Sequence, residues 1–288
     1  MDLAPTLLSL IGEQPPEWMQ GHAFLGEHVS PQPRHMFGFR GRMDERVDFV
    51  RTVTDGRYVY IRNFRPDLPA GQHVEYQFTN PGNQRWLDLF NAGKTNAAQS
   101  AFFLPTPPEQ LFDLSEDPYE IKNLANNPTH RAVKDQLASV LSQHMEKTRD
   151  LGFLPEVELH RRTAGRSPYD WAREPGNYDY ERIQLAAARA TLGPALPEAQ
   201  IRQQLADVEP AIRYWTLRGI GYPPAQSAAE IQPVVRGYLD SLRNLLGDES
   251  PVSRSPQPTC WCATANPSTA TWRFSCSPSG LIQPTTTS

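Results

Sequence analysis

A short run of alternating charges is the part of the sequence whose residue types best suit ligand binding. Residues 39–45 read FRGRMDE, and the charged members of this run are Arg40, Arg42, Asp44 and Glu45. A guanidinium can hold an anionic group through two parallel N–H donors, and a carboxylate can accept hydrogen bonds from hydroxyl groups or an amine. We therefore interpret these four residues as candidate ligand-binding residues. The alternative is a solvated charged turn.

Other side chains that could bind a ligand or a metal ion are weaker candidates. Residues 62–65, with the sequence RNFR, follow the next strand-like stretch and form a second, weaker candidate of the same kind. Cys260 and Cys262 are one residue apart with no histidine near them, which is a poor match to a zinc site. The histidines lack metal-site spacing as well, and they are His22, His28, His35, His73, His130, His144 and His160. The sequence therefore predicts no metal site in this chain.

Composition excludes some classes of partner. The chain has 288 residues, with 28 Lys and Arg against 32 Asp and Glu, so its net charge is −4. This balance excludes a strongly basic nucleic-acid binder. The apolar runs are shorter than the roughly 18 residues that would indicate a membrane span. We therefore expect neither a nucleic-acid partner nor a membrane partner.

The charged run must be positioned by a small antiparallel sheet with packed helices, which is an α+β fold. Residues 46–63 alternate like a β-hairpin whose turn is Asp55-Gly56, and residues 109–114 form a further short strand. Helices are predicted over residues 1–12, over 84–91 and over about 129–150, the last one ended by Gly152. Residues 64–82 are rich in Pro and Gly and are predicted to be irregular.

The second half of the chain has a different character. Residues 155–179 read as a polar linker, and short helical patterns follow at 181–192, 198–205, 209–220 and 228–246. Helices paired in this way suggest a HEAT-like segment over 180–252. From Ser253 onward the chain is Ser, Thr and Pro without periodicity, which predicts a disordered tail over 253–288. The abrupt change of composition there also fits translation out of frame.

Three motifs in the first 154 residues resemble the sulfatase family of the alkaline-phosphatase-like superfamily. Residues 111–125, LFDLSEDPYEIKNLA, are similar to that family's C-terminal signature. Residues 2–12, DLAPTLLSLIG, and residues 55–61, DGRYVYI, resemble the helix and the strand that precede it. The RTV and YIRNF stretches most resemble bacterial heparan N-sulfatase-like proteins. The resemblance implies that residues 1–154 form a sulfatase C-terminal subdomain.

The same resemblance implies where the chemistry lies. Sulfatases use a Cys or Ser oxidised to formylglycine within a Cys-x-Pro-x-Arg motif, together with a divalent cation, usually calcium. In the family these groups belong to a large N-terminal α/β domain. Residues 276–280, CSPSG, imitate the motif, but Gly280 replaces the arginine. We therefore expect no catalytic residue, metal ligand or cofactor in this chain, and we expect an N-terminal sulfatase domain as its partner.

The resulting prediction is a C-terminal fragment of a sulfatase-like hydrolase of sulfate esters or sulfamates on sugars, inactive by itself. The charged run at 40–45 would then recognise a sulfated, partly cationic sugar. The first 12 residues lack a basic region and do not resemble a signal peptide, although relatives of this family are often periplasmic or secreted. The alternative function is a non-catalytic helical-repeat module for protein interaction, centred on the helical segment.

Overall fold

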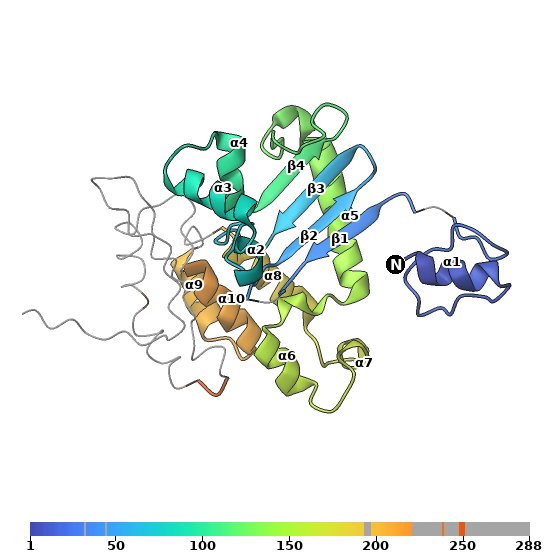
Figure 1. The fold of residues 1–288 in the computed structure, drawn as a ribbon. Helices are drawn as coiled ribbons and strands as arrows, with labels where there is room; N and C mark the ends of the chain where they lie inside the picture. The colour runs from blue at the N-terminus through green and yellow to red at the C-terminus, as the bar shows by residue number, and fades with distance from the viewer. Residues whose placement is uncertain (32, 44, 193–196, 221–237, 239–247, 251–288) are drawn as a thin grey trace, which may run out of the picture. The chain divides into compact units, whose positions relative to one another are not determined.

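The computed structural model describes residues 1–288 except 32, 44, 193–196, 221–237, 239–247 and 251–288 (Figure 1). The chain divides into two compact units that interleave along the sequence. The first unit contains Met1–Arg40, Val50–Arg62 and Glu109–His144, and the second contains Gly41–Phe49, Asn63–Pro108 and Met145–Ser288. The boundaries predicted at 154, 179 and 252 stay predictions.

The first unit is built on a four-stranded antiparallel sheet (Figure 1). Its strands are β1 (Met36–Arg40), β2 (Val50–Thr54), β3 (Tyr58–Asn63) and β4 (Glu109–Asp113), in that spatial order. Gly56 makes the turn between β2 and β3 with a φ of 95°, a conformation that glycine adopts without steric cost. The predicted hairpin, the predicted strand near 109–114 and the α+β class are confirmed.

Helix α5 (Arg131–Thr148) follows the 3₁₀ turn η2 (Pro128–His130) and lies across one face of the sheet (Figure 1). Leu137 and Leu141 of its predicted apolar stripe are buried. The helix ends at Thr148, close to the predicted end near residue 150, but Gly152 is not the residue that ends it, so that part of the prediction is wrong. It ends before Arg149, which has a φ of 53°. The amide of Asp150 then donates to the carbonyl of Met145, which closes the last turn.

The signature segment, residues 111–125, begins in β4 and makes side-chain hydrogen bonds that hold the local backbone. The Asp113 carboxylate accepts hydrogen bonds from Arg57 at 2.7 Å and from the Ser115 hydroxyl at 2.7 Å. These bonds hold the pKa of Asp113 well below its usual range. The Asn123 amide oxygen accepts from the Leu111 amide at 3.0 Å, and its amide nitrogen donates to the Glu109 carbonyl. The motif therefore stabilises β4 and the chain that follows it.

Helix α1 (Leu3–Leu10) confirms the predicted N-terminal helix but turns its polar side inward. The hydroxyl of Thr6 accepts a hydrogen bond from the Phe24 amide, and the hydroxyl of Ser9 accepts one from the His28 amide. Thr6 and Ser9 are buried beneath the loop that these bonds attach. The leucine side of the helix is exposed, with Leu3, Leu7 and Leu10.

Short helices occupy residues 75–103 of the second unit. They are α2 (Glu75–Phe78), α3 (Pro81–Asn91), α4 (Ala97–Ser100) and the 3₁₀ turn η1 (Ala101–Phe103). The predicted helix at 84–91 begins earlier, at Pro81, because the Asn80 side chain accepts a hydrogen bond from the Gly82 amide and caps it. Helix α2 falls inside the stretch predicted to be irregular.

The remaining described helices also belong to the second unit. They are η3 (Leu151–Phe153), α6 (Glu156–Arg162), α7 (Pro168–Arg173), α8 (Tyr180–Ala190), α9 (Glu198–Leu205) and α10 (Pro210–Ile220). Helices α6 and α7 lie in the stretch predicted as a polar linker, while α8, α9 and α10 confirm predicted helices. The predicted helix at 228–246 and the predicted tail fall outside the described residues, except for Tyr238. The HEAT-like arrangement therefore stays a prediction.

An aromatic cluster forms the centre of the second unit. The rings of Phe49, Phe64 and Phe153 lie within 4.9 Å of one another, centroid to centroid, and Trp215 of α10 lies 5.9 Å from Phe49. The Trp215 indole nitrogen donates to the Phe153 carbonyl at 2.8 Å. Helix α10 is thereby attached to the residues that lead into α6.

Among the helices in the described part of the chain, none is both long enough and apolar enough to cross a bilayer.

Candidate functional site

The residues of the charged run lie in different parts of the structure. Arg40 is the last residue of β1 in the first unit, where it pairs with Val50 of β2. Arg42 and Glu45 belong to the second unit and are exposed, and Glu45 lies in a turn between the bridged residues Met43 and Arg46. Asp44 lies outside the described residues. The substrate-binding role of Arg40, Arg42, Asp44 and Glu45 stays a prediction.

Arg42 is paired with a residue far away in the sequence. Its Nη1 atom donates to both carboxylate oxygens of Glu156, 114 residues further along the chain. The pair is open to solvent, because the Arg42 side chain is 58% exposed and that of Glu156 is 51% exposed. We call Arg42, Glu156 and His160 the Arg42 surface.

His160 completes this surface from the next turn of α6. Its Nε2 atom lies 3.6 Å from Oε1 of Glu156, the spacing expected for residues four apart on a helix. Neither Glu156 nor His160 was identified as a site residue from the sequence. Their distance from the charged run along the chain hides the relation, which only the fold creates.

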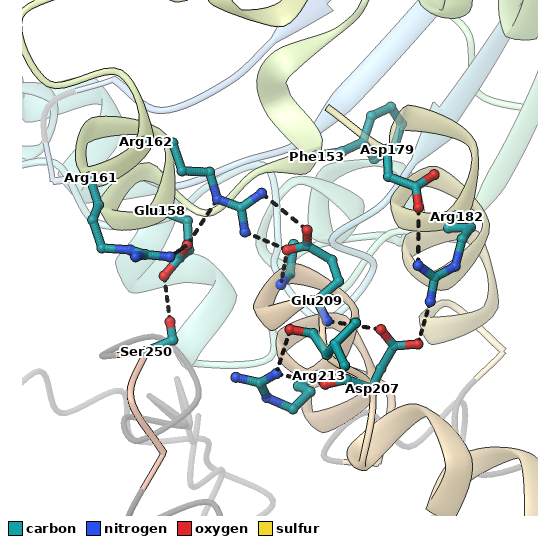
Figure 2. A network of polar contacts seen from close by, with 12 residues as sticks. Phe153, Glu158, Arg161, Arg162, Asp179, Arg182, Asp207, Glu209, Arg213 and Ser250 are labelled. Carbon is teal, nitrogen blue, oxygen red and sulfur yellow. Dashed lines mark hydrogen bonds and ion pairs between the residues drawn. The ribbon is translucent and has the colours of Figure 1, made fainter. Parts of the chain in front are cut away.

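The opposite side of α6 is held by a buried carboxylate (Figure 2). Glu158 is fully buried, and its Oε2 atom accepts hydrogen bonds from Arg161 at 2.8 Å and from Arg162 at 3.0 Å. The hydroxyl of Ser250 donates to the other oxygen, Oε1. Burial by itself would raise the pKa of Glu158, but the bonds from Arg161, Ser250 and Arg162 lower it below its usual range.

Arg162 links α6 to the start of α10. Its guanidinium donates through two nitrogens to the two oxygens of Glu209, at 3.1 and 2.5 Å (Figure 2). Glu209 in turn accepts from the Ala211 amide at the N-terminal end of α10. Burial alone would lower the pKa of Arg162, but the bonds to Glu209 and Glu158 raise it. This arrangement keeps Arg162 charged and orients α6.

The same network extends to α8 through Asp207. The Asp207 carboxylate accepts from Arg182 at 2.6 Å and from the Glu209 amide at 2.9 Å, while Arg182 also donates to Asp179 (Figure 2). Arg213 donates to the Asp207 carbonyl at 2.6 Å. Helices α6, α8 and α10 therefore share one set of polar contacts, which we call the α6 network.

The second candidate segment, residues 62–65, is built into the fold. Asn63, Phe64 and Arg65 are buried. Arg65 donates to both carboxylate oxygens of Asp67, at 2.9 and 3.0 Å, and Arg218 of α10 also donates to Asp67. The interpretation of this segment as a ligand-binding loop is wrong for these three residues, because their side chains are used in packing.

In the part of the chain that the structure describes, no group of three or more His, Cys, Asp or Glu side chains is placed so that it could hold a metal ion. Cys276 and the other cysteines lie outside the described residues.

The geometry of the Arg42 surface suits recognition rather than bond cleavage. A half-exposed guanidinium can bind an anionic group, and a half-exposed carboxylate can accept from a hydroxyl or an amine.

Comparison with known proteins gives two related sequences. An ulvan-active sulfatase of Formosa agariphila is 41% identical over 160 residues, which are 55% of this chain and 27% of that protein. Another ulvan-active sulfatase of the same organism is 29% identical over 157 residues, which are 52% of this chain and 29% of that protein. The chain thus spans between a quarter and a third of the length of these relatives. No family model matches the sequence.

Solved structures include similar chains, of which one is described. It is a candidate sulfatase from Bacteroides thetaiotaomicron, 19% identical, with a TM-score of 0.33 over 52% of this chain and 25% of that one. The sequence relatives confirm the family that the three motifs indicated. The chain carries a C-terminal portion of a sulfatase-family protein.

Proposed function

We propose that this chain forms part of a sulfatase-like hydrolase that removes sulfate from a sugar, by cleaving a sulfate ester or a sulfamate. The observation that carries the proposal is the 41% identity with an ulvan-active sulfatase over 160 residues. Both sequence relatives are named as ulvan-active sulfatases, so ulvan is the first substrate to test.

In this proposal the Arg42 surface binds substrate and does not cleave it. The guanidinium of Arg42 would donate to sulfate or carboxylate oxygens, while Glu45 would accept from a sugar hydroxyl or amine. Arg40 and Asp44 are proposed to contribute to the same recognition. The transfer of sulfate to water would use the nucleophile and calcium that the family places in its N-terminal domain.

The chain would therefore need a further sulfatase domain as its partner and would be inactive alone. The share of the relatives' length that the chain spans supports this requirement. The exposed leucines of α1 support it as well, because exposed apolar side chains gathered on one helix are typical of an interface.

A chimera tests the proposal directly. The aligned 160 residues of the 41% identical relative would be replaced by those of this chain, and release of inorganic sulfate from ulvan oligosaccharides would be measured. We expect activity in the chimera and none in the isolated chain.

Arg42→Ala in the chimera is expected to lower kcat/KM by about ten-fold or more, the value of a lost charge-assisted hydrogen bond. Arg166→Ala is the matched control, because Arg166 forms an ion pair of similar exposure with Glu174. A folded chimera without activity would contradict the proposed family function. Equal activity of the chimera and its Arg42→Ala variant would contradict the role of Arg42.

A further inference from the structure

We infer that Glu156 is a specificity-determining residue that competes with the ligand's anionic group for Arg42. The inference rests on the proposed function and adds a selection rule. The surface would admit a sugar with a single anionic group at Arg42 more readily than one with a second anionic group beside it.

The contact itself is the first support. One nitrogen of Arg42 donates to both oxygens of Glu156, so the carboxylate occupies part of the guanidinium edge that could hold a sulfate. Carboxylate and sulfate are equivalent partners for a guanidinium in charge and hydrogen-bonding chemistry. A sulfate that binds Arg42 through this nitrogen would therefore displace Glu156 from it.

Solvent exposure makes the exchange feasible. Ion pairs with both partners in water contribute little free energy, so a ligand can replace one partner at low cost. The Arg42–Glu156 pair is of this kind, with side chains 58% and 51% exposed. The Arg162–Glu209 pair is much less exposed, at 14% and 15%, and is enclosed in the α6 network.

Glu156 cannot move far when it is displaced. It is the first residue of α6, and α6 is anchored on its other side by Glu158 and Arg162. The displaced carboxylate therefore stays close to the bound anion. A negative charge held there repels a second anionic group on the ligand.

Binding to the whole chain tests the inference without requiring catalysis. The probes are a disaccharide with one sulfate and the same disaccharide with an additional sulfate on the adjacent hydroxyl. Binding is followed by NMR through the side-chain Nε–Hε signal of Arg42 and by calorimetry. The proteins are the wild type, Glu156→Gln, Arg42→Ala and the double variant.

We expect Glu156→Gln to tighten binding of the singly sulfated probe by about two- to five-fold, the equivalent of one exposed ion pair. The gain for the doubly sulfated probe should be larger. Arg42→Ala should weaken binding of either probe by about ten-fold or more. The Glu156→Gln effect should be absent in the Arg42→Ala background.

Glu174→Gln is the matched control, because its ion pair with Arg166 is 48% and 49% exposed and lies in the same unit. It should leave both affinities unchanged. The thermal unfolding of every variant is measured in parallel, so that a loss of structure is not mistaken for a loss of binding.

The outcomes separate the inference from the proposed function. Weakening by Arg42→Ala with no effect of Glu156→Gln would overturn the inference and leave the proposed binding role of Arg42 intact. Weaker binding by Glu156→Gln would show that Glu156 contacts the ligand as an acceptor, which also overturns the inference. Binding unaffected by Arg42→Ala would overturn the inference together with the proposed binding role of Arg42.

Discussion

The two sides of helix α6 carry the same chemistry in different surroundings. On one side Glu156 pairs with Arg42 in contact with water. On the other side Glu158, two residues later, is fully buried and accepts from Arg161, Arg162 and Ser250. Both sides are carboxylate–guanidinium contacts, so residue type alone does not distinguish them. Burial separates a contact that a ligand can replace from one that the fold requires.

The physical reason is the cost of an uncompensated charge. In water a carboxylate that loses its partner is solvated again, so the change in free energy is small. In a buried site it keeps its desolvation cost and loses the compensating hydrogen bonds. The two sides of α6 should therefore respond very differently to equivalent substitutions.

The largest expected effect is on the buried side. Glu158→Ala leaves Arg162 with Glu209 alone and removes the acceptor of Ser250. We expect the free energy of unfolding to fall by about 3–5 kcal/mol, as for other buried pairs that lose one partner. Urea unfolding followed by circular dichroism measures this loss. A loss below about 1 kcal/mol would show that Glu158 is not a buried charge in solution.

A smaller effect is expected from pH. The pKa of Glu158 in the folded state lies below its ordinary value of 4.5, so its ionised form stabilises the fold. This contribution is complete above the unfolded pKa and is lost as pH falls below about 4.5 toward the folded pKa. We expect the decrease in unfolding free energy over this range to be less steep in Glu158→Gln. An identical pH profile for wild type and variant would contradict the assignment.

Loss of the hydrogen bond between Trp215 and Phe153, just before α6, is expected to reduce stability less than loss of Glu158 does. Trp215→Phe removes the indole donor to the Phe153 carbonyl while it keeps an aromatic ring in the cluster. We expect a loss of about 1–2 kcal/mol, because a buried carbonyl is left without its partner. Thermal unfolding measures it, and Trp18→Phe at an exposed tryptophan is the control. Equal midpoints for the two variants would argue against the Trp215 bond.

The smallest effect on stability should be on the exposed side. Arg42→Ala and Glu156→Gln should each change the free energy of unfolding by less than about 0.5 kcal/mol, as is usual for surface sites. Their effects should appear in ligand binding instead. A large loss of stability in either variant would make this pair structural and remove the contrast between the two sides of α6.

Sequence patterns predicted the elements with strong local signals. The hairpin follows from alternating residues around Asp55-Gly56, and α9 spans the predicted residues 198–205. The residue that ends α5 was missed because this end depends on distant partners. Arg149 takes the left-handed conformation while its side chain donates to the carbonyls of Ala172 and Tyr178, 23 and 29 residues away. Helices α6 and α7 were missed because their residues are mainly polar and show little periodicity.

The sequence by itself determined the family and the local structure. The LFDLSEDP segment contains Asp113 and Ser115, and the hydrogen bond between these two side chains forms within three residues of chain. The sequence also showed the alternation of charges in the run that contains Arg42 and Glu45.

Only the tertiary structure decided which charges are available to a ligand. Glu156 and Glu158 are two residues apart in one helix, and no local pattern shows that one faces water and the other is buried. Glu156 is paired with Arg42, and Glu158 accepts from Ser250 as well as from Arg161 and Arg162 of its own helix. The fold brings residues 42 and 250 to α6 from far along the chain. Burial is a property of everything packed around a side chain, so it is set by these distant segments rather than by the residues of α6 alone.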